Sequence, residues 1–316
     1  MNQVLIQGKD RWVLAFVVVL VGVMIAAIAQ TIAAGREGIV RRDAWTETAQ
    51  GLVQALLAGE EVQVVDARSA AAYEGGHVRG ALSLPAASLV DEAFGAARLW
   101  PEIIAAVAQA GVDPERPTVV YAADPKDAAY VVWALRAAGL ADVKLLAGGV
   151  MALLEAGAPV ETGPADARPR SVDDYPGRQA PAKEIAVDLA GLYGGRGNPV
   201  QLVDTRAAAA EAIHLAGAAT HVVEGNALVH GDGVKRSRLA VNKALRPLGS
   251  ETAVVYGDDV RDAALVWWGL ASEGKKAQLF MDGFALWQAS GLPTQAVDRA
   301  PAAAQPSGMR VGGGCG

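Results

Sequence analysis

The chain has 316 residues and only one cysteine, Cys315, which excludes internal disulfides and sites built from several thiolates, such as iron–sulfur clusters. Aromatic residues are also scarce, at 5%, although hydrophobic residues reach 52%. The apolar excess is therefore Ala, Val and Leu, which is typical of helices and buried strands and not of disorder. Lys plus Arg total 28 against 34 Asp plus Glu, for a formal charge of −6. Because nucleic-acid binding needs a clustered basic face, this balance predicts no nucleic-acid partner.

Residues 12–35 lack charge altogether, and an apolar run of this length can cross a bilayer as one helix. A buried soluble helix is one alternative, and a cleaved signal peptide is another, because Ala27-Ile28-Ala29 has the small-x-small pattern. Lys and Arg residues flank the run on both sides, so their effects on orientation nearly cancel. We predict a short N-terminal segment, 1–11, and then a transmembrane helix. Since a short N-terminal anchor is usually an export signal, the soluble domains of this single-pass protein are expected on the extracytoplasmic (periplasmic) side.

The chain after this run contains one pattern twice. Val62-Gln-Val-Val-Asp66-Ala-Arg68 returns as Val200-Gln-Leu-Val-Asp204-Thr-Arg206, an offset of 138 residues. Trp133 returns as Trp268, an offset of 135 residues. An offset that drifts this slowly indicates a duplicated domain with small loop deletions.

Each copy predicts strands that alternate with helices. In the first copy, strands are expected near 62–65, 118–121 and 143–146, and helices near 47–58, 101–110, 127–138 and 150–156. Short apolar strands in this arrangement imply a mostly parallel sheet flanked by helices, which is an α/β fold. The two domains are predicted over 43–163 and 181–297, with a polar, proline-punctuated linker at 164–180 and a flexible tail at 298–316.

The repeated motifs are specific. The first copy has Asp66-Ala-Arg68, then Tyr73, then Gly76-His77-Val-Arg-Gly80-Ala81, and the second copy ends on Gly283, Trp287, Gly291 and Pro293. These motifs resemble the rhodanese domain, the fold of thiosulfate and mercaptopyruvate sulfurtransferases. The resemblance covers nearly all of the chain after residue 43 and implies two rhodanese-like domains in tandem. It also implies that Asp66, Arg68 and their counterparts in the second copy are mainly structural.

The resemblance further implies where a catalytic cysteine would lie. In active members it directly follows a central strand, where backbone N–H groups and the positive end of the next helix stabilise a thiolate or persulfide. An arginine that closes the loop helps to bind the anionic donor. In this chain the cysteine position holds Ala122 in the first copy and Gly257 in the second, and the arginine position holds Asp127 and Asp262. Neither loop has a nucleophile, so no catalytic residue is predicted.

Both degenerate loops are acidic, since they contain Asp124, Asp258 and Asp259 in addition to Asp127 and Asp262. Aspartate at the start of a helix is a good N-cap, and we interpret these five carboxylates as N-caps or as solvated groups. Coordination of a hard cation such as Ca²⁺ or Mg²⁺ by these carboxylates is the alternative. No pair of histidines has metal-ligand spacing with an acidic or thiol partner, so neither a metal nor a cofactor is predicted.

The sequence therefore predicts a membrane-anchored tandem rhodanese-like protein without catalytic activity that serves as a binding or scaffold subunit. The expected partner is another membrane protein or complex, recognised at the degenerate loops near the carboxyl ends of the strands. Two alternatives remain open. Cys315, on its glycine-rich tether, is a candidate reactive thiol for a sulfurtransferase or sulfur carrier. The loops could instead bind a small ligand and act as a sensor.

Overall fold

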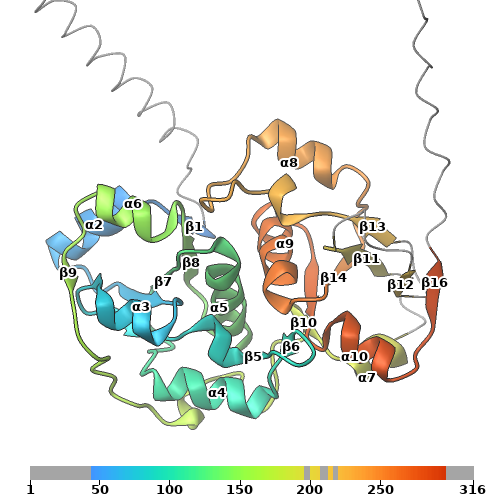
Figure 1. The fold of residues 1–316 in the computed structure, drawn as a ribbon, viewed down its shortest axis with the longest axis horizontal. Helices are drawn as coiled ribbons and strands as arrows, with labels where there is room; N and C mark the ends of the chain where they lie inside the picture. Colours follow the sequence, from blue (N-terminus) through green and yellow to red (C-terminus); the bar gives the residue numbers. More distant parts are fainter. Residues whose placement is uncertain (1–43, 196–199, 207–212, 216–219, 297–316) are drawn as a thin grey trace, which may run out of the picture.

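The computed structural model describes residues 44–195, 200–206, 213–215 and 220–296 (Figure 1). The predicted membrane segment 12–35 and the tail 298–316, with Cys315, lie outside these described residues. In the described ranges, none of the helices has both the length and the hydropathy that a bilayer crossing requires.

The first half consists of short strands and helices in the alternation that the sequence predicts. Its elements are β1 Thr46–Glu47, α2 Ala49–Ala58, β2 Gln63–Asp66, α3 Ala70–Gly75, β3 His77–Val78, β4 Leu82–Ser83, η1 Ala86–Leu89, β5 Val90–Asp91, β6 Ala96–Ala97, α4 Trp100–Gln109, β7 Thr118–Tyr121, α5 Pro125–Ala137, β8 Val143–Leu146, α6 Gly149–Glu155, β9 Val160–Glu161 and η2 Val172–Asp174. The strands expected at 118–121 and 143–146 are confirmed, and the four predicted helices lie within about two residues of their expected bounds.

The second half follows the same order, but its described residues include no counterparts of α3, β5 and β6. Its elements are β10 Ala186–Val187, α7 Leu189–Gly194, β11 Val200–Asp204, β12 Ile213–Leu215, β13 Thr220–Val222, η3 Gly225–Ala227, α8 Arg238–Leu245, β14 Thr252–Tyr256, α9 Val260–Ser272, β15 Ala277–Phe280, α10 Gly283–Ala289 and β16 Thr294–Ala296.

Each half contains one five-stranded parallel sheet. The strand order is β1-β8-β7-β2-β4 in the first sheet and β10-β15-β14-β11-β13 in the second, which is the same order element by element. The register also repeats, because Asp66 lies opposite Tyr121 and Asp204 lies opposite Tyr256. The predicted duplication of one α/β domain is therefore confirmed.

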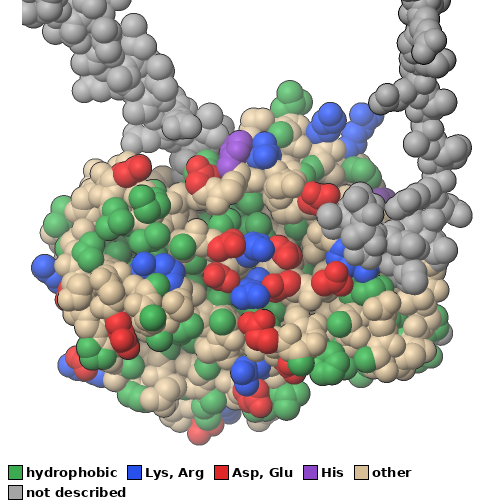
Figure 2. Space-filling view, in the orientation of Figure 1, with side chains coloured by type: hydrophobic (Ala, Val, Ile, Leu, Met, Phe, Trp, Pro, Cys, Tyr) green, Lys and Arg blue, Asp and Glu red, His purple; other side chains and the backbone are tan. Residues whose placement is uncertain are grey.

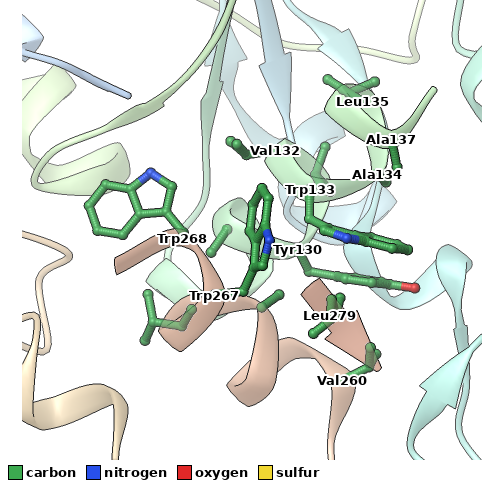
Figure 3. Packing of buried hydrophobic residues seen from close by; sticks show 14 of the residues in the cluster. Tyr130, Val132, Trp133, Ala134, Leu135, Ala137, Val260, Trp267, Trp268 and Leu279 are labelled. Atoms are coloured by element: carbon green, nitrogen blue, oxygen red, sulfur yellow. The ribbon is translucent and has the colours of Figure 1, made fainter. Parts of the chain in front are cut away.

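The two halves share one hydrophobic core. Helices α5 and α9 pack against each other at the centre of the molecule (Figure 1), and Figure 3 shows the aromatic side chains that meet there. Trp133, Trp267 and Trp268 are all fully buried in a cluster that draws residues from both halves. The indole of Trp267 meets the ring of Trp45 edge-on, with centroids 5.7 Å apart. The Trp268 indole N–H donates to the backbone carbonyl of Trp45 at 3.3 Å.

Candidate functional site

A buried network of Asp, Arg and Tyr fixes the strand ends that position both degenerate loops. The Tyr121 hydroxyl donates to Asp66 Oδ2 at 2.6 Å, and the Arg68 guanidinium donates to the same carboxylate and to the carbonyl of Gly76. Burial, with the nearby Asp66 charge, raises the pKa of Tyr121 well above its usual value, so the phenol stays protonated.

The same network recurs around Asp204 in the second half. Arg206 donates to Asp204 through Nε at 2.9 Å and through a terminal nitrogen at 2.7 Å, and its guanidinium also lies 3.6 Å from the centre of the Phe284 ring. Burial is again the main cause of a raised Tyr256 pKa, together with the charge of Asp204. Both networks hold their strand ends in place, which is the structural role expected for these residues.

The loops that follow β7 and β14 are only three residues long. Ala122, Ala123 and Asp124 connect β7 to α5, and Gly257, Asp258 and Asp259 connect β14 to α9.

Asp124 and Asp259 are the N-caps of these helices, since their carboxylates accept from the backbone N–H groups of Lys126 and Arg261. The N-cap interpretation is therefore confirmed at Asp124 and Asp259 and is wrong at Asp127 and Asp262. Each lies three residues further on, in the first helical turn.

The first residue of each loop is the position where the rhodanese resemblance implies a nucleophile in active members, and it is buried in both halves. Ala122 is buried, with 2% of its surface exposed. At Gly257, a Cβ atom would lie 2.4 Å from Thr205 Oγ1, closer than such contacts occur. Thr205 occupies the place that Ala67 has in the first half, so the halves carry an Ala–Ala pair and a Thr–Gly pair at equivalent sites.

A turn of the first half also packs against the degenerate loop of the second half. The Val260 N–H donates to the carbonyl of Gly95 at 2.7 Å. Gly95 has a positive φ of 59°, and a Cβ atom there would overlap the carbonyl oxygen of Asp258. Only glycine allows this approach, which places the β5–β6 turn directly against the degenerate loop.

Charged side chains cross between the two helix N-termini in a reciprocal pattern. Lys126 Nζ of α5 lies 3.1 Å from Asp262 Oδ1 of α9, and Arg261 of α9 lies 3.8 Å from Asp127 Oδ1 of α5. Arg261 also forms a bidentate pair with Asp259. Figure 2 shows these red and blue side chains alternating at the centre of one face. The two aspartates at the family's arginine positions are thus paired with cations of the opposite half.

The pKa values follow from this arrangement. Burial raises the pKa of Asp127, partly offset by the charge of Arg261. Burial also acts to raise the pKa of Asp259, but hydrogen bonds from Arg261 outweigh it and hold this pKa below its usual range. Within the described residues no group of His, Cys, Asp or Glu is placed to hold a metal ion. The geometry therefore gives the cation alternative no support beyond the acidity of the loops.

Replacing Arg261 with methionine is expected to lower the free energy of unfolding at pH 7 by about 1–3 kcal/mol, because Asp259 loses its charged hydrogen bonds. The loss should shrink in acid. A carboxyl group whose pKa falls on folding stabilises the protein above its unfolded pKa, about 3.9, and this contribution disappears as the pH falls through the folded value. Denaturant unfolding at pH 7 and pH 3 measures the difference.

The matched control is Lys126→Met, which removes the equivalent cation of the first half. Its partner Asp262 has 46% of its side chain exposed, so water screens the pair and the loss should be smaller. Equal losses at both pH values for Arg261→Met would contradict the assigned role of Asp259.

A cavity of about 900 Å³ lies between the halves, at the mouth of these loops. Its lining includes Lys126, Thr205, Arg206, Asp258 and Asp262. Among the described residues, the buried hydroxyl of Thr205 has no hydrogen-bond partner, whereas Arg206 is already held by Asp204 and Phe284. The charged residues of the lining are therefore of both signs, and none of the residues named here is a thiol or another nucleophile poised beside a base.

Comparison with known proteins identifies the family of the chain. The family model described as "Rhodanese-like domain" matches residues 49–156. SseB of Mycobacterium tuberculosis, whose name provisionally makes it a thiosulfate sulfurtransferase, is 30% identical over 288 residues, covering 81% of this chain and 97% of SseB. The chain belongs to the rhodanese-like family.

Solved structures of the rhodanese-like fold agree with this assignment. SseA of Escherichia coli, from a study of 3-mercaptopyruvate sulfotransferases, is 20% identical with a TM-score of 0.61, over 76% of this chain and 98% of SseA. The anaerobic ergothioneine biosynthesis enzyme of Chlorobium limicola is 18% identical with a TM-score of 0.65, over 81% of this chain and 71% of the enzyme. At these identities the similarity shows the fold alone.

Proposed function

We propose that this rhodanese-like protein is catalytically silent and serves as a membrane-anchored binding or scaffold subunit of a membrane complex. The observation that carries the proposal is the contact at Gly257, where Thr205 Oγ1 fills the space that a side chain would need. The equivalent residue of the first half, Ala122, is buried and has no nucleophilic atom. Sulfur transfer by a rhodanese needs a thiolate at one of these positions.

The electrostatics of the second loop support the same proposal. Asp258, Asp259 and Asp262 surround the N-terminus of α9, where an active enzyme would hold a sulfur anion. Burial raises the pKa of Asp258, and Arg206 offsets this effect. Carboxylates at this end of the helix repel an anionic donor such as thiosulfate, whereas a bare helix N-terminus would attract it.

The anchor of the proposed scaffold is the uncharged run 12–35. The surface offered to a partner is the cavity between the halves, whose lining includes exposed charged side chains. Asp258, for example, has 63% of its side chain exposed. A membrane protein with a basic segment would complement the carboxylates there.

A sulfur carrier that uses Cys315 is the second candidate. One observation favours it: SseB, whose name refers to thiosulfate sulfurtransfer, aligns over 81% of this chain, and Cys315 is the only thiol that the chain has.

A thiosulfate:cyanide sulfurtransferase assay on the purified full chain separates the two candidates. We expect no turnover above buffer, and no change on Cys315→Ser, because neither loop can form a persulfide. Turnover that disappears in Cys315→Ser would establish the sulfur carrier and overturn the silent scaffold. Turnover that survives Cys315→Ser would show that the loops catalyse without a thiol, and would overturn both.

A further inference from the structure

The charge of the protein is unevenly distributed. Although the whole chain carries −6, residues 233–250 contain five Lys or Arg and no Asp or Glu. This stretch includes α8, the helix that precedes β14.

The basic side chains of α8 lie on its outer face. Val241 and Leu245 are buried against the second half, whereas Arg238, Leu239 and Lys243 are exposed, and Leu239 has 81% of its surface accessible. Figure 2 shows blue side chains gathered over α8 at the upper edge of the molecule. Among the described residues, Arg238, Lys243 and Arg246 have no ion-pair or hydrogen-bond partner for their side chains. Their charges are thus free to interact outside the protein.

The fold itself does not require a basic face at this place. Helix α4 is the counterpart of α8 in the first half, since it precedes β7 as α8 precedes β14. Its sequence, Trp-Pro-Glu-Ile-Ile-Ala-Ala-Val-Ala-Gln, contains no Lys or Arg and one acidic residue, Glu102. Two copies of one fold therefore present opposite charges at equivalent helices, which indicates a function that only the second copy has.

Helix α8 lies beside the start of the described chain. A cavity of about 830 Å³ is lined by Thr48 and Gln50, close to the first described residue, and by Ser237 and Ala240 at the start of α8. Only residues 36–43 separate the proposed membrane segment from Ala44, and eight extended residues span at most about 28 Å. The anchor would therefore keep this part of the protein close to the bilayer surface.

We propose that the outer face of α8 docks on anionic lipid headgroups of the membrane that holds the anchor; this rests on the anchor in the proposed function. Arg238, Lys243 and Arg246 face phosphate groups within the screening length of about 8–10 Å, and Leu239 enters the headgroup layer. Docking at a second point fixes the orientation of the two domains, so that the cavity between the halves is presented to partners in a constant direction.

The test uses the full chain with Cys315→Ser and a single fluorophore at Asn242→Cys, on the exposed face of α8. The protein is reconstituted in phosphatidylcholine vesicles with or without phosphatidylglycerol, each with a nitroxide on a fraction of the headgroups. We expect strong quenching with phosphatidylglycerol and weak quenching without it. Each Lys or Arg contributes about five-fold to such partitioning, so Arg238→Gln, Lys243→Gln and Arg246→Gln together should reduce the docked-to-undocked ratio about 100-fold.

Two controls are matched to this design. A fluorophore at Gln109→Cys, on the exposed face of α4, should not be quenched in either vesicle. The triple variant Arg116→Gln, Arg178→Gln and Lys183→Gln removes the same charge from exposed positions away from α8 and should leave quenching at residue 242 unchanged. Equal quenching at residue 242 in both vesicles, or in both triple variants, would overturn the proposal. So would a label that is unquenched by anionic lipid but protected in native membranes, because a protein would then cover α8.

Flotation with pure phosphatidylcholine vesicles tests the anchor separately from docking by α8. These vesicles carry no net charge, so the basic side chains of α8 contribute nothing to binding. Flotation without quenching by anionic lipid keeps the anchor and overturns docking by α8. Failure to float with phosphatidylcholine, combined with salt-sensitive flotation on phosphatidylglycerol that requires the α8 cations, overturns the anchor and supports the basic face.

Discussion

Replacing Trp267 with alanine is expected to destabilise both halves of the protein together, by about 3–5 kcal/mol. The side chain is fully buried, its indole N–H donates to the carbonyl of Ala277 at 3.0 Å, and its ring meets Trp45 of the first half. The substitution removes contacts on both sides of the α5–α9 interface. Because the core is continuous across this interface, a defect there weakens the first domain as well as the second.

Hydrogen exchange resolved by segment measures this effect. In Trp267→Ala, amides of α5 and α9 should lose protection by similar factors. The matched control is Trp287→Ala, because Trp287 is also buried but belongs to a separate cluster within the second half. That variant should expose amides of α10 first and leave α5 protected in its native state. Unchanged protection of α5 in Trp267→Ala would show that the halves are independent folding units.

The architecture of each half could be predicted from the sequence because the signals for its strands and helices are local. A run of β-branched and aromatic residues such as Thr118–Tyr121 identifies a buried strand, and the nearly constant offset identifies its partner in the second copy. The equivalence of Asp66 and Asp204 follows in the same way. The N-cap at Asp124 has a local signal as well, since Pro125 after an aspartate is typical of the first residue of a helix.

The relation between the halves could not be predicted in this way. The offset aligns Lys126 with Arg261 and Asp127 with Asp262, so each half brings one cation and one anion to the same helical turn. Their reciprocal pairing depends on α5 and α9 packing side by side, which is a long-range contact without a signature in either segment. The contact of Thr205 with residue 257 could not be predicted either, because the two residues are far apart in the sequence. Thr205 also lies in the variable middle position of the Asp-x-Arg motif.

Substituting Gly257 with alanine is expected to cost about 1–3 kcal/mol of unfolding free energy, the usual range for inserting a methyl group into a filled site. The backbone at Gly257 does not itself require glycine, and the one atom that lies too close is Thr205 Oγ1, at 2.4 Å. Thr205→Ala alone should be nearly neutral, because the hydroxyl that it removes is buried and has no hydrogen-bond partner in the described part of the chain. The double variant reproduces the Ala67–Ala122 pair of the first half and should recover most of the loss.

The double-mutant cycle shows whether Thr205 causes the destabilisation by Gly257→Ala. If steric contact with Thr205 excludes side chains from residue 257, the coupling energy between the two substitutions should match the cost of Gly257→Ala, about 1–3 kcal/mol, and be favourable in sign. The control cycle pairs Gly257→Ala with Ala67→Gly, which lies at the equivalent position of the other half and should show no coupling. Additive losses in the first cycle would mean that something other than Thr205 keeps residue 257 small. A coupled result means that one threonine closes the nucleophile position, so that restoring a cysteine there would require a change at residue 205 first.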